Sequence, residues 1–284
     1  MPKFKKAVII GVGLIGGSLA GILKARGLAD TVVGVGRSRQ NLEEAVGLGL
    51  IDSYSLSVSE AAGGADLVVL TCPVGMFESI AEEIKPHLAA GAIVTDAGSV
   101  KGSMVYRLEE MLAPISFVGA HPIAGSDRSG ACAADIKIFE GARCILTPTK
   151  KTAATALSAI QAIWETAGSR VVHMEPFVHD SVFAKVSHLP HIAAFGLVSA
   201  VAGMEGGLDA MEYAAGGFRD TTRIAASHPD MWRDICLHNP ESIVEALSAY
   251  IAKLEELKGM IENGDGDTLA EEFGKAQEIR KGMN

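Results

Sequence analysis

The chain has 284 residues, of which 48% are hydrophobic and 21% are charged. This balance is that of a folded globular protein and excludes an intrinsically disordered one, and the length suits two domains. The formal net charge of −9 argues against a nucleic-acid partner, which requires a basic surface. A small anionic substrate is still possible, because a few arginines can make one pocket positively charged despite the negative net charge of the chain.

The cysteines and the apolar segments indicate a cytoplasmic protein without a membrane partner. The apolar run near the N-terminus breaks at Gly11 and has no cleavage site, so it predicts a first strand and no signal peptide. The longest apolar stretch, Ile192–Met204, is too short to span a bilayer and predicts a buried helix. The cysteines lack CxxC spacing and are expected to be reduced, mostly buried thiols: Cys72, Cys132, Cys144 and Cys236.

From Lys6 to about Met174, short β-branched runs alternate with helical segments. The runs predict strands at Ala7–Ile10, Thr31–Val35, Leu67–Thr71, Ile93–Thr95, Phe117–Gly119, Cys144–Thr147 and Arg170–His173. Helices are expected at Leu14–Arg26, Asn41–Leu48 and Thr152–Thr166. This rhythm predicts an α/β fold: residues 1–175 form a doubly wound Rossmann-type domain with a mainly parallel sheet.

After about Pro176 the strand signals stop, and residues 176–284 are predicted to form an all-helical domain. The expected helices are Val178–Met204, Leu208–Ala215, Thr221–Ala226, Asp230–Asn239, Glu241–Asn263 and Thr268–Lys281. Pro240 fits the first turn of the penultimate helix, with Asn239 as its cap. The long apolar run needs more partner surface than about 110 residues supply, so we expect a homodimer through this domain.

A GxGxxG pattern follows the first predicted strand and opens a helix: Gly11, Val12, Gly13, Leu14, Ile15 and Gly16. The pattern alone could be a simple glycine-rich turn. Its position in a βαβ unit favours a dinucleotide site, in which the glycines allow a tight turn, close approach of the pyrophosphate and packing of helix on strand. The free N–H groups of the helix N-terminus then face the phosphates.

The end of the second strand bears on the choice of cofactor. An acidic residue that would bind the ribose 2′-hydroxyl is missing there, and no carboxylate occurs before Glu43. Arg37, Ser38 and Arg39 could instead bind a 2′-phosphate, although a solvated basic turn is the alternative interpretation. The sequence therefore favours NADP, with NAD still possible.

Three further strand ends carry polar loops, and ligands of open α/β sheets bind at such ends. Cys72 and Pro73 follow one strand and are expected beside the cofactor. The loop Asp96–Gly102 follows the next and contains Ser99, and the loop His121–Asp127 follows the third. A lone histidine at a strand end is more often structural, but one beside a serine-bearing loop above a dinucleotide is a candidate catalytic residue.

Five segments make the chain resemble the prephenate and arogenate dehydrogenases along essentially its whole length. They are DAGSVKG at Asp96–Gly102, HPIAGSDRSG at His121–Gly130, SHLPH at Ser187–His191, GGFRDTTRIA at Gly216–Ala225 and PDMWRDI at Pro229–Ile235. The segments occur in the family's order, and the combination is far more specific than any one of them.

The resemblance implies roles for individual residues. His121 matches the catalytic histidine, which accepts the hydrogen bond from the substrate's 4-hydroxyl as hydride leaves C4 for the nicotinamide. Ser99 matches the serine that orients this hydroxyl. Arg223 matches the arginine that holds a substrate carboxylate, and His191 matches a histidine lining the same pocket. The reaction needs no metal.

Other residues receive weaker expectations from the same resemblance. Ser126 and Asp127 are expected at the pocket mouth, and Asp220 is expected to orient Arg223 or pair with it. His188 is taken as structural. Trp232 could lie in the core or at a dimer interface, with the interface favoured, and Lys101 could cap its helix or bind substrate. We interpret five further histidines as surface or packing residues: His87, His173, His179, His228 and His238.

Two alternatives remain open. One is another dehydrogenase that joins a Rossmann domain to a helical domain, such as a β-hydroxyacid dehydrogenase or an imine reductase. The other is a regulator that binds NADP without turnover, although a sensor has no need of a base aligned with a carboxylate clamp. Nothing in the residues distinguishes prephenate from arogenate as the substrate.

Overall fold

The computed structural model describes residues 3–126 and 128–283 and contains one eight-stranded sheet. Its strands are β1 (Phe4–Ile10), β2 (Ala29–Val35), β3 (Ser53–Ser55), β4 (Leu67–Leu70), β5 (Ile93–Asp96), β6 (Ser116–Pro122), β7 (Arg143–Thr147) and β8 (Arg170–His173). Their spatial order is β3-β2-β1-β4-β5-β6-β7-β8. All neighbours pair in parallel except β6 and β7, so the predicted mainly parallel sheet is confirmed.

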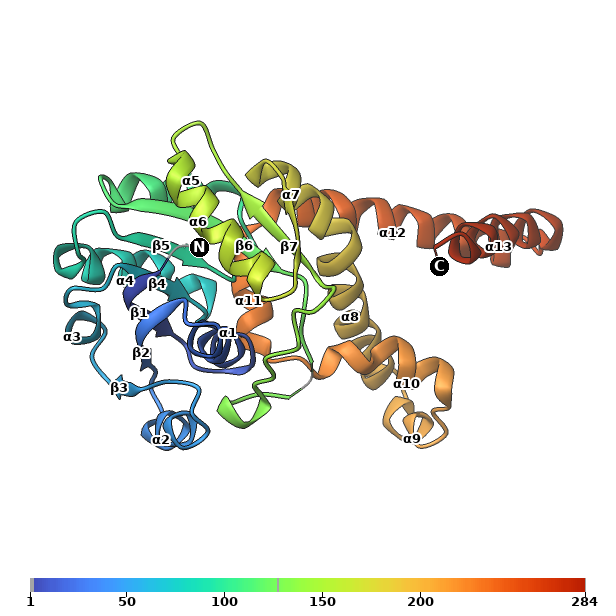
Figure 1. The fold of residues 1–284 in the computed structure, drawn as a ribbon. Coiled ribbons are helices and arrows are strands. Elements are labelled where there is room, and N and C mark those ends of the chain that lie inside the picture. The colour runs from blue at the N-terminus through green and yellow to red at the C-terminus, as the bar shows by residue number, and fades with distance from the viewer. Residues whose placement is uncertain (1–2, 127, 284) are drawn as a thin grey trace.

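Helices cover both faces of this sheet (Figure 1). They are α1 (Leu14–Ala25), α2 (Arg39–Gly47), α3 (Val58–Ala62), α4 (Phe77–Ile84), α5 (Gly102–Leu112) and α6 (Ala154–Thr166). Successive side chains of β1 enter different cores: Ile9 packs with residues of α1 and α6, and Val8 packs with residues of α3, α4 and α5. The sheet is therefore buried on both sides, which explains why its strands are continuous apolar runs.

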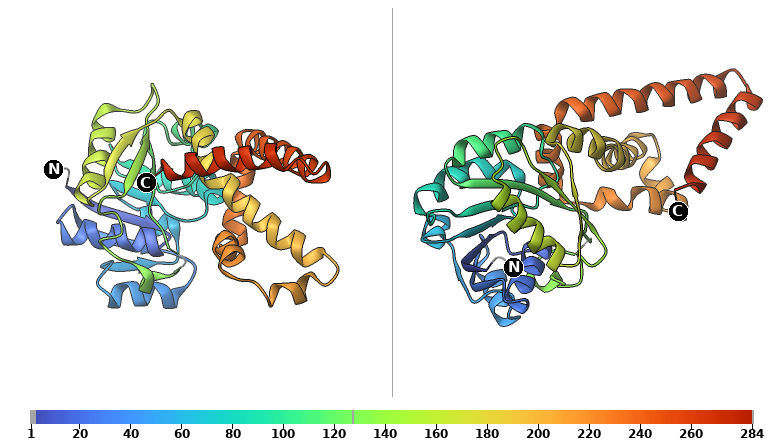
Figure 2. Two further views of the ribbon diagram at one scale, coloured as in Figure 1. Left: turned by 90° about the vertical axis from the view of Figure 1, so that its right-hand side faces the viewer. Right: turned by 45° about the horizontal axis from the view of Figure 1, so that its top comes forward.

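The remainder of the chain is helical. Its elements are α7 (Pro176–Phe183), a π-helical turn (Ala184–His188), α8 (Leu189–Gly203), α9 (Gly207–Met211), α10 (Gly216–Thr222), a 3-10 turn (Arg223–Ala226), α11 (Pro229–His238), α12 (Pro240–Glu262) and α13 (Gly266–Lys281). Helix α11 returns to the sheet domain, whereas α12 and α13 form an arm that projects away from it (Figures 1 and 2). Only Ile243 and Ala246 of α12 are buried, and the described residues of α13 include no buried one.

The predicted helix Val178–Met204 is confirmed, since the π turn joins α7 to α8 into one helical stretch, Pro176–Gly203. Other expectations need correction. The apolar stretch Ile192–Met204 is not buried in the single chain, because within α8 only Ala194 is buried. By length and composition alone the helical stretch Pro176–Gly203 could cross a membrane: it has 28 residues, and its most apolar window has a mean hydropathy of 1.4 with 11% of that window buried.

The other corrections concern single residues. Pro240 occupies the first turn of α12 as predicted, but Asn239 does not cap the helix with its side chain. Its amide instead donates to the backbone oxygen of Asp180 at 2.9 Å. All four cysteines are free as expected, yet only Cys144 is buried.

Candidate active site

A cavity of about 690 Å³ lies where the carboxyl ends of β4, β5 and β6 meet α8 and α11. It is lined by residues from all of the predicted strand-end loops. Nine residues singled out in the sequence contribute to its wall: Leu14, Ile15, Arg37, Cys72, Pro73, Ser99, His121, Ser126 and His191. Residues that are far apart in the chain are thus brought to one place by the parallel strands, whose carboxyl ends share one edge.

The glycine-rich turn fits a dinucleotide. Leu14 and Ile15, which directly follow Gly13, line the cavity, whereas Gly11, Gly13 and Gly16 are not among its lining residues. Gly11 has a φ of +106°, and a Cβ there would lie 2.6 Å from the backbone oxygen of Thr71. A Cβ on Gly16 would lie 2.2 Å from the backbone oxygen of Gly11, whereas one on Gly13 would meet nothing within 4 Å. The turn is therefore tightly packed at Gly11 and Gly16 and leaves open space at Gly13. The N-terminus of α1 has no side-chain cap and no acidic residue in its first turn, so its N–H groups suit a pyrophosphate.

The three polar residues after β2 have different surroundings. Arg37 is exposed and lines the cavity. The hydroxyl of Ser38 accepts a hydrogen bond from the backbone N–H of Asn41 at 3.3 Å and so caps α2. Arg39 donates to the hydroxyl of Tyr54 at 3.2 Å, outside the cavity. Only Arg37 of the three therefore faces the space in which a cofactor could lie.

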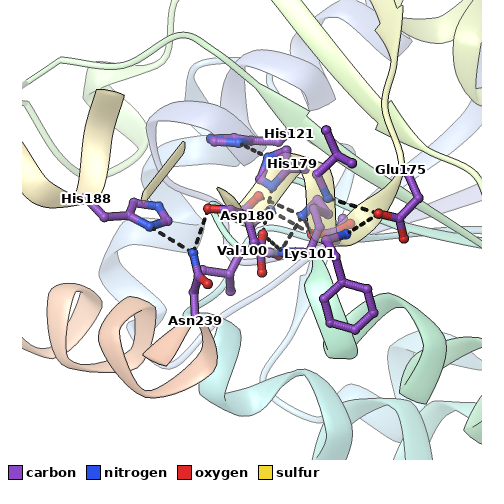
Figure 3. A network of polar contacts seen from close by, with 12 residues as sticks. Val100, Lys101, His121, Glu175, His179, Asp180, His188 and Asn239 are labelled. Carbon is purple, nitrogen blue, oxygen red and sulfur yellow. Dashed lines mark hydrogen bonds and ion pairs between the residues drawn. The ribbon is translucent and has the colours of Figure 1, made fainter. Parts of the chain in front are cut away.

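His121 is buried near the end of β6 and belongs to a chain of hydrogen bonds (Figure 3). Its Nδ1 lies 2.8 Å from Nε2 of His179, and Nδ1 of His179 lies 2.8 Å from Oδ1 of Asp180. Burial lowers the pKa of His121 well below its usual value and lowers that of His179 to about 2. Both imidazoles are therefore neutral at physiological pH, as a proton acceptor must be.

A buried ion pair fixes the neighbouring Ser99 loop. Nζ of Lys101 lies 2.6 Å from Oδ2 of Asp96 and donates to the backbone oxygens of Gly98 and Val100 at 2.7 and 3.1 Å. The other oxygen of Asp96 accepts from the backbone N–H of Ala120 at 2.9 Å. Lys101 thus neither caps α5 with its side chain nor reaches the cavity; it ties the loop after β5 to β6.

The helical domain supplies the opposite wall. His191 uses Nδ1 to bind the backbone oxygen of Ser187 at 2.9 Å and stacks on Trp232, with ring centroids 3.9 Å apart. Its pKa is lowered, chiefly by burial and to a smaller extent by the charge of Arg223. Trp232 is only 7% exposed, so it is buried within the chain, contrary to the expectation of an interface residue.

Two predicted substrate residues, Arg223 and Asp220, are not among the described residues that line the cavity. Arg223 begins the 3-10 turn after α10 and is exposed in the single chain. Asp220 is also exposed, and the described residues show no ion pair between it and Arg223, so its role in orienting Arg223 stays a prediction. Asp127 lies outside the described residues.

The sequence reasoning missed two residues of the buried chain, His179 and Asp180. They precede His188, which is buried, with Nδ1 3.4 Å from the amide of Asn239. Its Nε2 is buried without a hydrogen-bond partner among the described residues, so it is not the fully bonded structural histidine that the sequence suggests. His179 matches no motif and is 58 positions away from His121, so the sequence leaves it among the surface or packing residues. The one available signal is the adjacent pair His179 and Asp180 in α7, the first helix after the sheet.

Together, the sheet and the cavity define a class of protein: a dehydrogenase that joins a Rossmann-type dinucleotide domain to a helical second domain. A family model described as the nucleotide-binding domain of prephenate dehydrogenase matches residues 19–173. A second, described as the dimerization domain of the same enzyme, matches residues 175–275. The chain belongs to the prephenate dehydrogenase family.

Individual relatives agree with this assignment along their whole length. The chain is 38% identical to the cyclohexadienyl dehydrogenase of Zymomonas mobilis, covering 99% of this chain and 96% of the relative. Its structure matches that of prephenate dehydrogenase from A. aeolicus in complex with hydroxyphenyl propionate and NAD+, with a TM-score of 0.93 and 39% identity over 99% of this chain and 98% of that one. The arogenate dehydrogenase of Synechocystis matches with a TM-score of 0.81 and 30% identity over 98% and 100% of the two chains.

Proposed function

We propose that this protein oxidatively decarboxylates prephenate to 4-hydroxyphenylpyruvate, with hydride transfer to NADP or NAD, on the route to tyrosine. Arogenate, which would yield tyrosine directly, is the alternative substrate. The observation that carries the proposal is one cavity lined by Leu14 and Ile15 at the start of α1, by Ser99 and by a neutral, buried His121. A base beside a dinucleotide site is what alcohol oxidation requires.

Each residue of the site has a part in this reaction. Nε2 of His121 accepts the proton of the substrate's 4-hydroxyl, and Ser99 orients that hydroxyl toward it. Arg223 holds a substrate carboxylate and Asp220 orients Arg223, while His191 and Ser126 line the pocket. When CO2 leaves, the ring becomes aromatic and the same oxygen takes the proton back, so the reaction needs neither a metal nor an added acid.

The cofactor accepts the hydride, and residues of the N-terminal domain hold it. Gly11, Gly13 and Gly16 shape the turn for the pyrophosphate, and Leu14 and Ile15 present the helix N-terminus. Cys72 and Pro73 lie beside the cofactor. We propose NADP as the preferred form because Arg37 faces the cavity after β2, where NAD-specific enzymes place an acid. NAD remains usable, and its presence in the A. aeolicus structure supports this.

We also propose residues 1–175 and 176–284 as the two domains, and a homodimer formed through the second. The exposed apolar residues of α8, α12 and α13 support this arrangement, since one chain leaves them uncovered. The description of the second family model, which names a dimerization domain, supports it as well. A cytoplasmic location fits the free thiols.

Product analysis tests the proposed reaction directly. The purified protein is incubated with NADP or NAD and with either prephenate or arogenate, and the reduced cofactor, the aromatic product and CO2 are measured. Equal amounts of all three products with one of the substrates support the proposal. Cofactor binding without turnover of either substrate would contradict it and favour a nucleotide-binding regulator.

A further inference from the structure

We propose that His179 and Asp180 form a buried relay with His121, which fixes the tautomer of His121 and compensates the positive charge that it gains. The three side chains lie in line, with 2.8 Å between each pair of bonded atoms (Figure 3). Neither His179 nor Asp180 lines the cavity, so both are positioning residues that act through His121.

The tautomers follow from the donors and acceptors of the chain. An ionised Asp180 can only accept, and its Oδ1 already accepts the backbone N–H of Lys101 at 2.7 Å. His179 must therefore donate from Nδ1, which leaves Nε2 with its lone pair. This nitrogen can only accept from Nδ1 of His121, so Nε2 of His121 carries the free lone pair. It is the nitrogen that a substrate hydroxyl needs.

The charges around the relay make Asp180 its counterion. Lys101 has the opposite sign, but its ammonium group is bound to Asp96 at 2.6 Å, and the two form a neutral buried pair. The other titratable groups packed around the relay are His188, which burial keeps neutral at neutral pH, and the Cys144 thiol, whose pKa burial raises. The three-residue unit therefore has a net negative charge at rest. It becomes neutral when His121 takes up the proton.

This compensation solves a problem that burial creates. A buried imidazole resists protonation, because a lone positive charge inside the protein is poorly solvated. With Asp180 in line, protonation removes a buried charge instead of adding one. The O–H bond of the substrate breaks and an N–H bond forms at Nε2 of His121. The proton returns to the same oxygen as CO2 leaves, so the unit ends each turnover as it began.

The packing around Asp180 holds this residue in one position. A Cβ on Gly102 would lie 2.5 Å from Oδ2 of Asp180, so α5 approaches this carboxylate as closely as a glycine allows. The backbone oxygen of Asp180 accepts from Asn239 at the start of α12. The relay is thus held by α5 from the sheet domain and by α7 and α12 from the helical domain.

Nitrogen NMR of the free protein tests the tautomers without substrate or cofactor. The protein is labelled with ¹⁵N-histidine, and the signals of His121 and His179 are assigned by their loss in His121→Gln and His179→Gln. We expect both residues as the Nδ1–H tautomer at neutral pH. A His121 protonated at Nε2 would overturn the relay. The relay serves the proposed reaction, but this measurement is independent of it, so failure of one is distinguishable from failure of the other.

Kinetics of Asp180→Asn test the charge. The amide keeps the size and an acceptor oxygen but removes the charge, so kcat should fall by about 10²-fold or more with little change in KM. Because burial raises the pKa of Asp180 to about 6, wild-type activity should fall as pH decreases through this value. The variant lacks this titrating group, so its acidic limb should move down by about one pH unit or more, to the protonation of His121, whose pKa burial holds well below its usual value.

The matched control is His188→Gln, which removes an equally buried histidine that is not in the relay. The pH at which the activity of this variant falls on acidification should equal that of the wild type, even if its melting temperature is lower. If Asp180→Asn loses rate without moving the limb, or if His188→Gln moves it equally, the relay is wrong. If Asp180→Asn does not fold, His179→Gln is used instead, because it also breaks the path from Asp180 to His121.

Discussion

His121 illustrates how a residue's surroundings decide its chemistry. Burial lowers its pKa and keeps the imidazole neutral, which prevents protonation by solvent at physiological pH. The same burial would make it a poor base without a neighbouring negative charge. In the proposed relay, Asp180 supplies this charge through His179.

Replacing Arg223 by Ala should raise KM for prephenate about tenfold or more, with a smaller change in kcat. The lost contact is a charged hydrogen bond to a carboxylate that is present both before and during the reaction. Arg223→Lys should restore only part of the affinity, because an ammonium group cannot bind a carboxylate through two parallel bonds. Steady-state kinetics measure both effects, and an unchanged KM in Arg223→Ala would remove this residue from the site.

A second residue-scale prediction concerns Arg37. The double variant Gly36→Asp with Arg37→Ala should shift the ratio of kcat/KM for NADP over NAD toward NAD. The new carboxylate is tolerated because a Cβ on Gly36 meets Leu42 at an ordinary 3.5 Å. Since Arg37 is exposed, its contribution should be about a few-fold in affinity.

Arg39→Ala is the control for the cofactor prediction, because this arginine is bonded to Tyr54 outside the cavity. The ratio of kcat/KM for NADP over NAD should stay near that of the wild type in Arg39→Ala. A double variant whose ratio does not move would show that the 2′ position is recognised elsewhere. A large effect of Arg39→Ala would assign the phosphate contact to Arg39 instead.

At the scale of elements, two glycines of the glycine-rich turn should matter for different reasons: Gly13 for cofactor binding and Gly16 for the stability of the fold. Gly13→Ala should leave the melting temperature unchanged, because its Cβ enters open space, but should raise the KM of the cofactor by obstructing the pyrophosphate. Gly16→Ala should instead destabilise the fold by ~1–3 kcal/mol, since its Cβ would lie 2.2 Å from a backbone oxygen. Thermal unfolding and cofactor titration distinguish the two, and equal melting temperatures for both variants would contradict this interpretation.

The elements that the sequence predicts best are those whose local pattern and burial agree. The strand β4 is a continuous apolar run, and β1 ends in one at Ala7–Ile10, because both faces of the sheet are covered there. In contrast, β3 is a three-residue polar edge strand, Ser53–Ser55, which has no apolar pattern to reveal it. The π turn at Ala184–His188 is invisible for another reason: its residues continue a helical pattern, and only the hydrogen bonds reveal the change.

At the scale of the whole molecule, the exposed apolar arm predicts a dimer. The wild type should sediment as a dimer at micromolar concentration, and Leu254→Asp on α12 should weaken association. Leu254 is 45% exposed in the single chain, and a buried carboxylate at an apolar interface is costly. The matched control is Leu48→Asp in the sheet domain, at a leucine that is 55% exposed and should leave the dimer intact.

Sedimentation velocity of the two variants checks this expectation. A monomeric wild type, or a Leu48→Asp variant that dissociates as readily as Leu254→Asp, would contradict dimerisation through the helical domain.

The part of the site that local sequence motifs encode was predictable. The glycine turn, Ser99 and His121 each lie at a predicted strand end, so the topology alone brings them together. His179 and Asp180 could not be found in this way, because their importance depends on how the first helix of the second domain docks onto the sheet. The same limit applies to Asp220, whose proximity to Arg223 in sequence did not produce an ion pair.

The most direct test of the account is the steady-state rate of prephenate-dependent cofactor reduction in His121→Asn, compared with the wild type. Positioned base catalysis contributes roughly 10²–10⁴-fold, so kcat should fall by about this factor while KM for prephenate and the melting temperature change little. A variant that folds and keeps nearly full kcat would show that His121 is not the base, and would contradict the proposed mechanism.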